Sequence, residues 1–227
     1  MNSFTIKPIA FARTDFKEKF GIPRQSGRSP SNVGEIVFLP EYSNPDAFRE
    51  LEGFSHIWLL FDFSACRDKG WSPLVRPPRL GGNKKVGVFA SRSPFRPNPI
   101  GLSSVKLEKI NYTPSGVTLT VSGIDLLDGT PVLDVKPYLP SADCHQNATG
   151  GYAMQFTNYK LKVEFDKNLL DLIPTDKQSA LLECLADDPR PSYQDDGREY
   201  GMNFAGYNVK FTVSDNLLKV TDISNNR

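Results

Sequence analysis

Cysteine is scarce in this sequence of 227 residues, and the few present are arranged neither for disulfides nor for metal. Cys66, Cys144 and Cys184 lie far apart and include no CxxC pair, which argues against a disulfide framework and a zinc site. We expect all three to be small buried residues, and we expect no bound metal. Free cysteines of this kind are typical of the reducing cytosol, so we expect a cytoplasmic protein.

Histidine is scarcer still, and the motifs of several enzyme classes are missing. The sequence has two histidines, His56 and His145, and contains no HExxH, GxSxG, P-loop or GxGxxG motif. Metal-dependent hydrolysis and a Ser-His-Asp triad are therefore poor fits. His56 stands inside the apolar run at residues 55–63, where we expect a core histidine with satisfied hydrogen bonds rather than a ligand.

Long apolar runs and a strong net charge are also absent. The longest apolar run, IWLLFDF, is too short and too charged to cross a bilayer. The first twenty residues lack the apolar core and the cleavage site of a signal peptide. The formal net charge is +1, so any argument for a polyanionic partner depends on local patches.

Short segments typical of β-strands fill the first two thirds of the chain. Each mixes β-branched or aromatic residues with polar ones, between glycines and prolines. Their spacing predicts a closed barrel or a sandwich. One short helix is predicted at residues 44–54, with Asn44 as its cap, Pro45 at the first helical position and Gly53 at its end. The predicted strands are residues 3–12, 34–40, 55–63, 84–91, 101–110 and 116–127.

The last third of the chain combines one helix pattern with strand patterns. The predicted elements are a strand at residues 159–165, a helix at residues 175–189 and a hairpin at residues 207–223. The helix has Thr175 as its cap, an apolar stripe of leucines and Pro189 at its end. A polar, turn-rich segment at residues 138–151 precedes this unit as a linker. These patterns predict a β domain at residues 1–155 and a small α+β domain at residues 156–227.

The segment at residues 76–109 is unusually basic and stiff. It contains eight basic residues and one acid, Glu108, in a chain whose net charge is +1. Three prolines at positions 94, 97 and 99 fix φ, so the loop is pre-shaped and the ordering cost of binding is lower. Like charges at this density repel one another and favour an anionic partner. The functional interpretation is a site for a phosphate or a carboxylate, and the simpler alternative is a solvated loop.

Two further polar segments, residues 19–30 and 123–140, are too long or too charged to be simple connectors. The second contains Asp125, Asp128 and Asp134. A carboxylate at a strand end can accept hydrogen bonds from a ribose or an amine. Turn chemistry is the simpler explanation, because Asp-Gly is a common turn pair.

Several long motifs resemble the TsaA-like family, whose bacterial two-domain members are the TrmO tRNA methyltransferases. The segment GVFASRSPFRPNPIGLS is similar to the family signature. FGIPRQ, LEGFSHIWLLFDF, VRPPRLGG, DLLDGTPVLDVKPYLP and DPRPSY also resemble family segments, in the family's order. The resemblance covers nearly the whole chain. It implies a mainly β protein, with a small closed β-barrel that binds S-adenosylmethionine without a Rossmann domain.

The resemblance also implies an activity and an assembly. The family transfers a methyl group to N6 of threonylcarbamoyladenosine at tRNA position 37, beside the anticodon, and its members are homodimers with the cofactor pocket near the subunit interface. The alternative from another class is a barrel that binds a nucleotide-like ligand or RNA without catalysis. An inert interaction domain is harder to reconcile with the basic segment.

The same resemblance implies which residues hold the cofactor. Arg92 matches the arginine that faces it, and residues 125–128 match an acidic turn. The implied cofactor-binding residues are Pro23, Arg24, Gln25, Ser64, Ala65, Arg92, Leu102, Asp125, Leu126, Leu127 and Asp128. The chain departs from the family at Ser64, where members often have histidine, and at Ser91, which replaces a threonine but keeps a hydroxyl.

Three residues are candidates for contacts to the RNA. DPRPSY resembles the motif that places the tRNA, which makes Arg190 a candidate for a phosphate and Tyr193 for base stacking. Arg96 is a candidate for the carboxylate of the modified base, which arginine can bind bidentately. Residues 161–227 carry eight bases and twelve acids, so a basic groove would come mainly from residues 76–109. The sequence identifies no general base.

Overall fold

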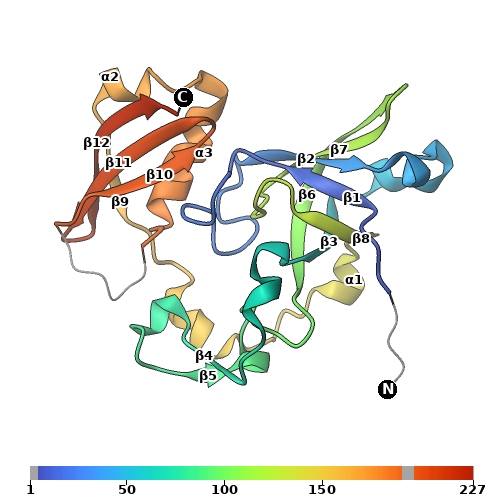
Figure 1. Cartoon of the computed structure of the whole chain (residues 1–227), viewed down its shortest axis with the longest axis horizontal. Coiled ribbons are helices and arrows are strands. Elements are labelled where there is room, and N and C mark those ends of the chain that lie inside the picture. The colour runs from blue at the N-terminus through green and yellow to red at the C-terminus, as the bar shows by residue number, and fades with distance from the viewer. Residues whose placement is uncertain (1–4, 191–196, 227) are drawn as a thin grey trace.

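The computed structural model describes residues 5–190 and 197–226 (Figure 1). Six antiparallel strands close into a barrel in the order β1-β2-β7-β6-β3-β8. They are β1 (Ala10–Arg13), β2 (Val33–Phe38), β3 (His56–Asp62), β6 (Ile100–Thr113), β7 (Gly116–Ser122) and β8 (Pro131–Pro137). The predicted mainly β fold is therefore confirmed, and of the two predicted architectures the structure has the closed barrel rather than the sandwich.

Alternation of side chains along the strands produces the barrel core. In β3, Ile57, Leu59 and Phe61 point inward and are buried, whereas the residues between them are more exposed. Trp58 lies on the outer face, where its indole N–H donates to Asp143 at 2.9 Å. A strand of period two exposes alternate residues to opposite faces, so one apolar face per strand is enough to fill a small barrel.

A second sheet forms the core of the C-terminal unit (Figure 1). Its strand order is β10-β11-β12-β9, and only the β12–β9 pair is parallel. Helix α3 (Thr175–Ala186) buries Ala180, Leu181, Cys184 and Leu185. The other elements of this unit are β9 (Lys162–Glu164), α2 (Lys167–Leu170), β10 (Tyr200–Phe204), β11 (Tyr207–Ser214) and β12 (Leu217–Asn225).

The core of the C-terminal unit is completed by a residue from the start of the chain. Phe16 is fully buried in that core and lies edge-to-face against Phe204, with ring centroids 5.6 Å apart. Phe20 and Ile22 from the same loop pack against the same cluster. The loop that leaves β1 therefore reaches the C-terminal unit before it returns to β2, and its apolar side chains belong to the core of that unit.

Short elements connect the strands, and here the sequence predictions were partly wrong. The predicted helix at 44–54 is two 3-10 turns, because Glu50 takes a left-handed φ of 65° between them; Asn44 does cap the first. The predicted strand at 84–91 is reduced to two residues followed by another 3-10 turn. The 3-10 turns are η1 (Pro40–Tyr42), η2 (Pro45–Phe48), η3 (Leu51–Gly53), η4 (Ser64–Lys69), η5 (Pro78–Leu80), η6 (Val88–Ala90) and η7 (Gly151–Phe156).

Some elements were missed by the sequence patterns. Strands β8 and β10 lie in segments with polar or glycine-interrupted sequence, and the predicted linker at 138–151 contains the short helix α1 (Pro140–Asp143). The remaining small strands, β4 (Leu74–Val75) and β5 (Val86–Gly87), form a separate ribbon. Thr175 is the first residue of α3 rather than its cap.

Two predictions of burial were also wrong. His56 is exposed at the start of β3, where its ring lies 2.9 Å from the Ser55 hydroxyl, because the alternation puts this position outside the barrel. Cys144 is exposed after α1, whereas Cys66 and Cys184 are buried as expected. None of the helices within residues 5–190 and 197–226 has the length and apolar character needed to cross a membrane.

Candidate functional site

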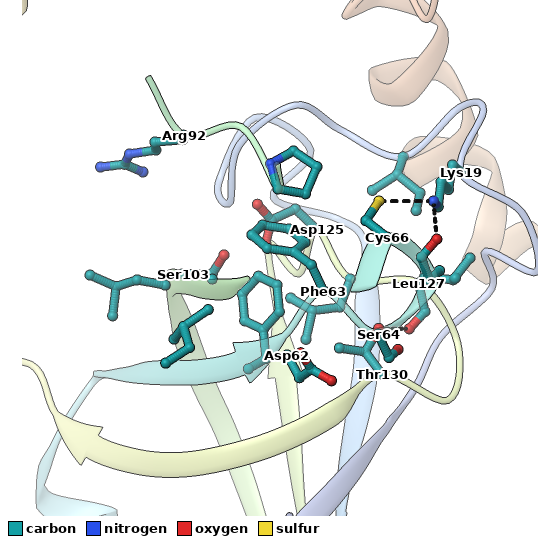
Figure 2. Close-up of a pocket in the computed structure, with 18 of the residues that line it drawn as sticks. Lys19, Asp62, Phe63, Ser64, Cys66, Arg92, Ser103, Asp125, Leu127 and Thr130 are labelled. Atoms are coloured by element: carbon teal, nitrogen blue, oxygen red, sulfur yellow. Dashed lines mark hydrogen bonds between the residues drawn. The ribbon is translucent and has the colours of Figure 1, made fainter. Parts of the chain in front are cut away.

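A cavity of about 540 Å³ opens at one end of the barrel, where β3 ends and β6 begins. Its walls come from the loop after β1, from η4, from the basic loop and from the loop after β7. Figure 2 shows Arg92 and Ser103 toward one side of this pocket, Lys19 and Cys66 toward the other, and Asp125 between them. Pockets of this size suit a nucleotide-sized ligand.

Gly101, which has no side chain, shapes the cavity wall. A Cβ on Gly101 would lie 2.3 Å from the ring of Phe61, its neighbour across the β3–β6 pair. The glycine therefore lets the Phe61 ring lie flat against β6 at the pocket end of the barrel. The ring of Phe63 continues this apolar surface, edge-to-face with Phe61 at 5.1 Å between centroids.

The structure brings most of the predicted cofactor residues to this cavity. The lining includes Pro23, Arg24, Gln25, Ser64, Ala65, Arg92, Leu102, Asp125, Leu126 and Leu127. Asp128 is the exception and faces away, because its carboxylate accepts from Lys17 Nζ at 2.7 Å and from the Thr14 backbone N–H at 2.9 Å. Residues 125 and 128 belong to one turn, yet their side chains are used on opposite sides of it.

Arg92 and Gln25 connect two walls of the cavity. The guanidinium of Arg92 donates to Oε1 of Gln25 at 2.5 Å, and the arginine is otherwise exposed. Ser91, which stands where the family has threonine, donates to the Val88 carbonyl at 2.8 Å and accepts from the Ser93 backbone N–H at 3.2 Å. The hydroxyl that the two residue types share is thus used to hold the turn that presents Arg92.

Arg96 has a structural use in the same loop. Its Nη1 donates to the carbonyl oxygens of Val88 at 3.1 Å and Ser91 at 2.7 Å, and its guanidinium lies over the Phe89 ring at 5.7 Å. Arg96 also lines the cavity. Its role toward the RNA carboxylate stays a prediction, whereas its role in shaping the loop is visible.

If Arg96 only holds the shape of the loop that carries Arg92, Arg96→Ala should weaken cofactor affinity and turnover on tRNA by similar factors of about ten, because the loop loses two charged hydrogen bonds. Titration calorimetry and a methyl-transfer assay measure the two quantities. Arg49→Ala, which removes an exposed pair with Asp46, should change neither. If turnover falls at least tenfold more than affinity, Arg96 contacts the RNA directly.

Asp125 is the most unusual titratable group in the cavity. Burial raises its pKa to about 6, and hydrogen bonds from the Ser103 hydroxyl and the Ser26 backbone together with the charge of Arg92 only partly oppose this. Its Oδ1 is enclosed and has no hydrogen-bond partner among the described residues. Polar atoms buried without a partner are rare in folded proteins and often mark a functional site.

Other polar residues of the cavity were not predicted from the sequence. Lys19 Nζ donates to the Ala65 carbonyl at 2.8 Å and lies 3.0 Å from Cys66 Sγ, so it fastens the loop after β1 to η4. Asp62, at the end of β3, is buried and pairs with Arg67 at 2.5 Å. Isolated polar residues of this kind carry no motif, and only the inward position of Ser103 in the alternation of β6 was a usable signal.

An ionic cluster fills the junction between the barrel and the C-terminal unit. We call its members, Arg24, Arg28, Arg79, Asp187, Asp188 and Arg190, the junction cluster. Arg28 pairs with Asp187, and Arg79 Nη2 donates to the Asp187 carbonyl at 2.5 Å. Asp188 binds Arg190 Nε at 3.0 Å. Both aspartates are nearly inaccessible, so these charges are satisfied by one another rather than by water.

Two residues that were predicted to contact ligands also take part in this junction. Arg24 lines the cavity with part of its side chain, but its Nη2 donates to the Arg190 carbonyl at 2.6 Å. Burial lowers the pKa of Arg24, and the nearby Arg79 adds to this effect. Arg190 is 7% exposed and bound to Asp188, and its contact to an RNA phosphate stays a prediction. Tyr193 lies outside the described residues.

The predicted basic segment divides into separate functions. Arg79 is paired within the junction cluster, and Arg96 is hydrogen-bonded to a carbonyl of its own loop. Lys106 pairs with Glu108 at 2.9 Å on the outside of β6. The exposed members that have no ion pair with another described residue are Arg76, Lys84, Lys85, Arg92 and, on β6, Lys109. Four of these five free cations therefore lie around the β4–β5 ribbon and the rim of the cavity.

Fold and site together define a class of protein: a small closed β-barrel with a cation-rimmed cavity at one end, joined by a buried ionic junction to an α+β unit. Residues 11–144 match the family model for the tRNA-methyltransferase O N-terminal domain, and residues 158–226 match the model for the TrmO C-terminal domain. The chain belongs to the TrmO family, which confirms the resemblance found in its sequence.

Named relatives and solved structures agree with this assignment over most of the chain. The tRNA (adenine(37)-N6)-methyltransferase of Escherichia coli is 44% identical over 224 residues, which cover 95% of both chains. The enzyme of the same name from Eikenella corrodens is 49% identical over 162 residues, 70% of this chain and 91% of the relative. The crystal structure of TrmO from Pseudomonas aeruginosa superimposes with a TM-score of 0.81 at 36% identity, covering 99% and 98% of the two chains.

Proposed function

We propose that the chain is an S-adenosylmethionine-dependent methyltransferase that methylates N6 of threonylcarbamoyladenosine at position 37 of tRNA. The observation that carries the proposal is the cavity at the barrel end, in a chain that matches tRNA (adenine(37)-N6)-methyltransferases over nearly its whole length. The family membership supports the enzyme class, and the residues of the cavity support the cofactor.

The donor set of the cavity fits S-adenosylmethionine. The apolar surface of Phe61, Phe63 and Leu126 suits the adenine ring, and the cation of Arg92 suits the carboxylate of the methionine part. The orphan oxygen of Asp125 suits a group with N–H or O–H donors, or a cationic centre. We propose that the ten predicted residues that line the cavity hold the cofactor, and that Asp128 acts only by fixing their turn through Lys17.

The protein's contribution to such a reaction is mainly to position two reactants. When bound, S-adenosylmethionine supplies an electrophilic methyl group. The Arg92–Gln25 bond and the Lys19 bridge hold opposite walls of the cavity, so the site is formed before the ligand arrives. Orientation of two reactants on a preformed surface can contribute on the order of 7–11 kcal/mol to rate acceleration.

Incubation with labelled S-adenosylmethionine and tRNA tests the activity. Label should enter tRNA that carries threonylcarbamoyladenosine and should be absent from the same tRNA prepared without that modification. Binding of the cofactor without transfer to either tRNA pool would support the alternative, a non-catalytic barrel that binds a nucleotide-like ligand or RNA. Transfer to both pools would contradict the proposed substrate while leaving the enzyme class intact.

We propose that tRNA docks on the exposed cations around the β4–β5 ribbon. The double variant Lys84→Ala/Lys85→Ala should weaken tRNA binding. It should also reduce the slope of log Kd against log salt concentration by roughly one to two, because fewer counterions are released when fewer phosphates are contacted. Filter binding across a salt series measures both. Lys219→Ala, which removes a lysine paired with Glu164 in the C-terminal unit, is the matched control and should change little. An unchanged salt slope in the double variant would place the docking surface elsewhere.

We also propose that the chain works as a homodimer with the cavity near the interface. Ile100 and Leu102 line the cavity and are exposed by 38% and 47%, and Phe89, on the basic loop, is exposed by 76%. Large apolar side chains exposed together at a site mark a surface that is covered in the functional assembly. Light scattering should give twice the mass of 25.3 kDa, and Leu102→Glu should shift the protein toward one chain. A monomeric wild-type protein would overturn this proposal.

A further inference from the structure

Asp125 differs from the other carboxylates near the cavity, because it has no ion-pair partner in the part of the chain that the structure describes. Asp62 lines the same cavity but pairs with Arg67 at 2.5 Å, and Asp128 in the same turn pairs with Lys17 at 2.7 Å. Asp125 forms no ion pair with any described residue, and its Oδ1 has no hydrogen-bond partner. A carboxylate enclosed in this way is costly unless something at the site requires it.

The surroundings keep the carboxylate in place without neutralising it. The Ser103 hydroxyl of β6, the Ser26 backbone and the charge of Arg92 each lower the pKa of this carboxylate and so favour its ionised form. Its burial raises its pKa to about 6, so it is ionised at neutral pH and is a stronger base than an exposed aspartate. The other charged or titratable groups of the cavity are Lys19, Arg24, Asp62, Cys66 and Arg96, and each has a partner of its own.

We propose that Asp125 is the general base of the methyl transfer; this inference rests on the proposed function. As the lone pair of the acceptor N6 forms a bond to the methyl carbon, the bond from that carbon to sulfur breaks and its electron pair stays on sulfur. The proton of N6 passes to the carboxylate of Asp125, which becomes a neutral carboxylic acid. The acid then returns the proton to solvent as the products leave.

The enclosed position of Asp125 suits this step. One negative carboxylate and one positive sulfonium are present before transfer, and both charges have disappeared after it. A poorly solvated site favours a reaction in which opposite charges disappear, because the neutral products need less solvation by water than the charged reactants do. A base whose pKa is close to the working pH also transfers protons more effectively than an ordinary aspartate. General-base catalysis typically contributes 10²–10⁴-fold to the rate.

Asp125→Asn is the decisive variant, because the amide keeps the shape of the side chain and cannot take the proton. At saturating cofactor, we expect its single-turnover rate on threonylcarbamoylated tRNA to fall by about 10²–10⁴-fold. The pH profile of kcat/KM in the wild-type protein should rise with a midpoint near pH 6, and this rising limb should be absent from the variant. Asp134→Asn, a paired and partly exposed aspartate on β8, should keep both the rate and the limb.

A stability measurement on the ligand-free protein checks that Asp125→Asn folds and that the carboxylate is enclosed. The native pKa lies above the ordinary value of about 3.9, so the native state is favoured by protonation and loses stability as the pH rises through 6. The free energy of unfolding of Asp125→Asn should therefore increase relative to wild type between pH 4 and pH 7. A variant that is less stable than wild type at pH 7 contradicts the enclosed carboxylate.

Two results would overturn the proposal that Asp125 is the general base. One is a rate at saturating cofactor within threefold of wild type, with the loss confined to cofactor affinity, which would make Asp125 a cofactor anchor. The other is a rising limb near pH 6 that persists in the variant. Failure of the proposed function is distinguished by the wild-type protein, which would then transfer no methyl group to threonylcarbamoylated tRNA.

Discussion

Asp188→Asn is expected to lower the free energy of unfolding by about 3–5 kcal/mol, because it leaves buried arginines without a counter-charge. The carboxylate of Asp188 accepts from Arg190 Nε and from the Tyr159 hydroxyl at 3.0 Å each, and lies 3.6 Å from Arg79. Asp188 has a left-handed φ of 53°, which asparagine tolerates well, so backbone strain does not confound the comparison. Chemical denaturation of the full chain measures the change.

The same variant is expected to reach the cofactor site. The carbonyl of Arg190 holds the Arg24 guanidinium, and Arg24 lies in the wall of the cavity. Loss of order at residues 187–190 should therefore weaken cofactor affinity as well as stability. Asp46→Asn is the control, because its pair with Arg49 is exposed and should contribute little. A loss of less than about 1 kcal/mol in Asp188→Asn would show that the junction cluster does not stabilise the fold.

Phe16→Ala is expected to cost about 3–5 kcal/mol, the range for a large aromatic side chain removed from a packed core. Phe16 is fully buried against Phe204, 188 positions later in the chain. The expected effect is selective: hydrogen exchange should increase in β10, β11 and β12 more than in the barrel strands. The reason is that the lost side chain belongs to the core of the C-terminal unit.

Phe11→Ala is the matched control for this prediction. Phe11 lies five residues earlier on β1, is 38% exposed, and should cost much less on removal. If Phe16→Ala increases exchange equally in both units, the loop after β1 acts as a general clamp rather than as part of one core. If it changes neither stability nor exchange, the packing of Phe16 on the C-terminal sheet is wrong.

Both predictions bear on how the loop between β1 and β2 contacts the C-terminal unit. It carries Phe16 into the C-terminal core, Arg24 and Arg28 into the junction cluster, and residues 23–25 into the wall of the cavity. Ser29 and Ser31 add hydrogen bonds to Glu183 of α3 at 2.8–3.1 Å. A change in how the C-terminal unit sits is therefore transmitted to the cofactor wall by direct contacts.

The sequence by itself determined the strand-rich fold and most of the barrel strands. Alternation such as that of β3 and β7 is local: each residue's face is fixed by its position in the strand, so neighbouring residues are enough to predict it. The basic segment and its stiffness could also be read directly, because charge and proline are properties of the chain. The long idiosyncratic motifs were sufficient to identify the family.

Only the tertiary structure decided which charges are free and which are used. Arg79 and Arg92 look alike in the sequence, yet Arg79 is half-buried beside Asp188 and Arg92 is exposed at the cavity. Asp125 and Asp128 belong to one turn, and of the two only Asp125 has no ion pair with a residue that the structure describes. The role of each charge is set by residues far along the chain that folding brings beside it, and no local pattern contains that information.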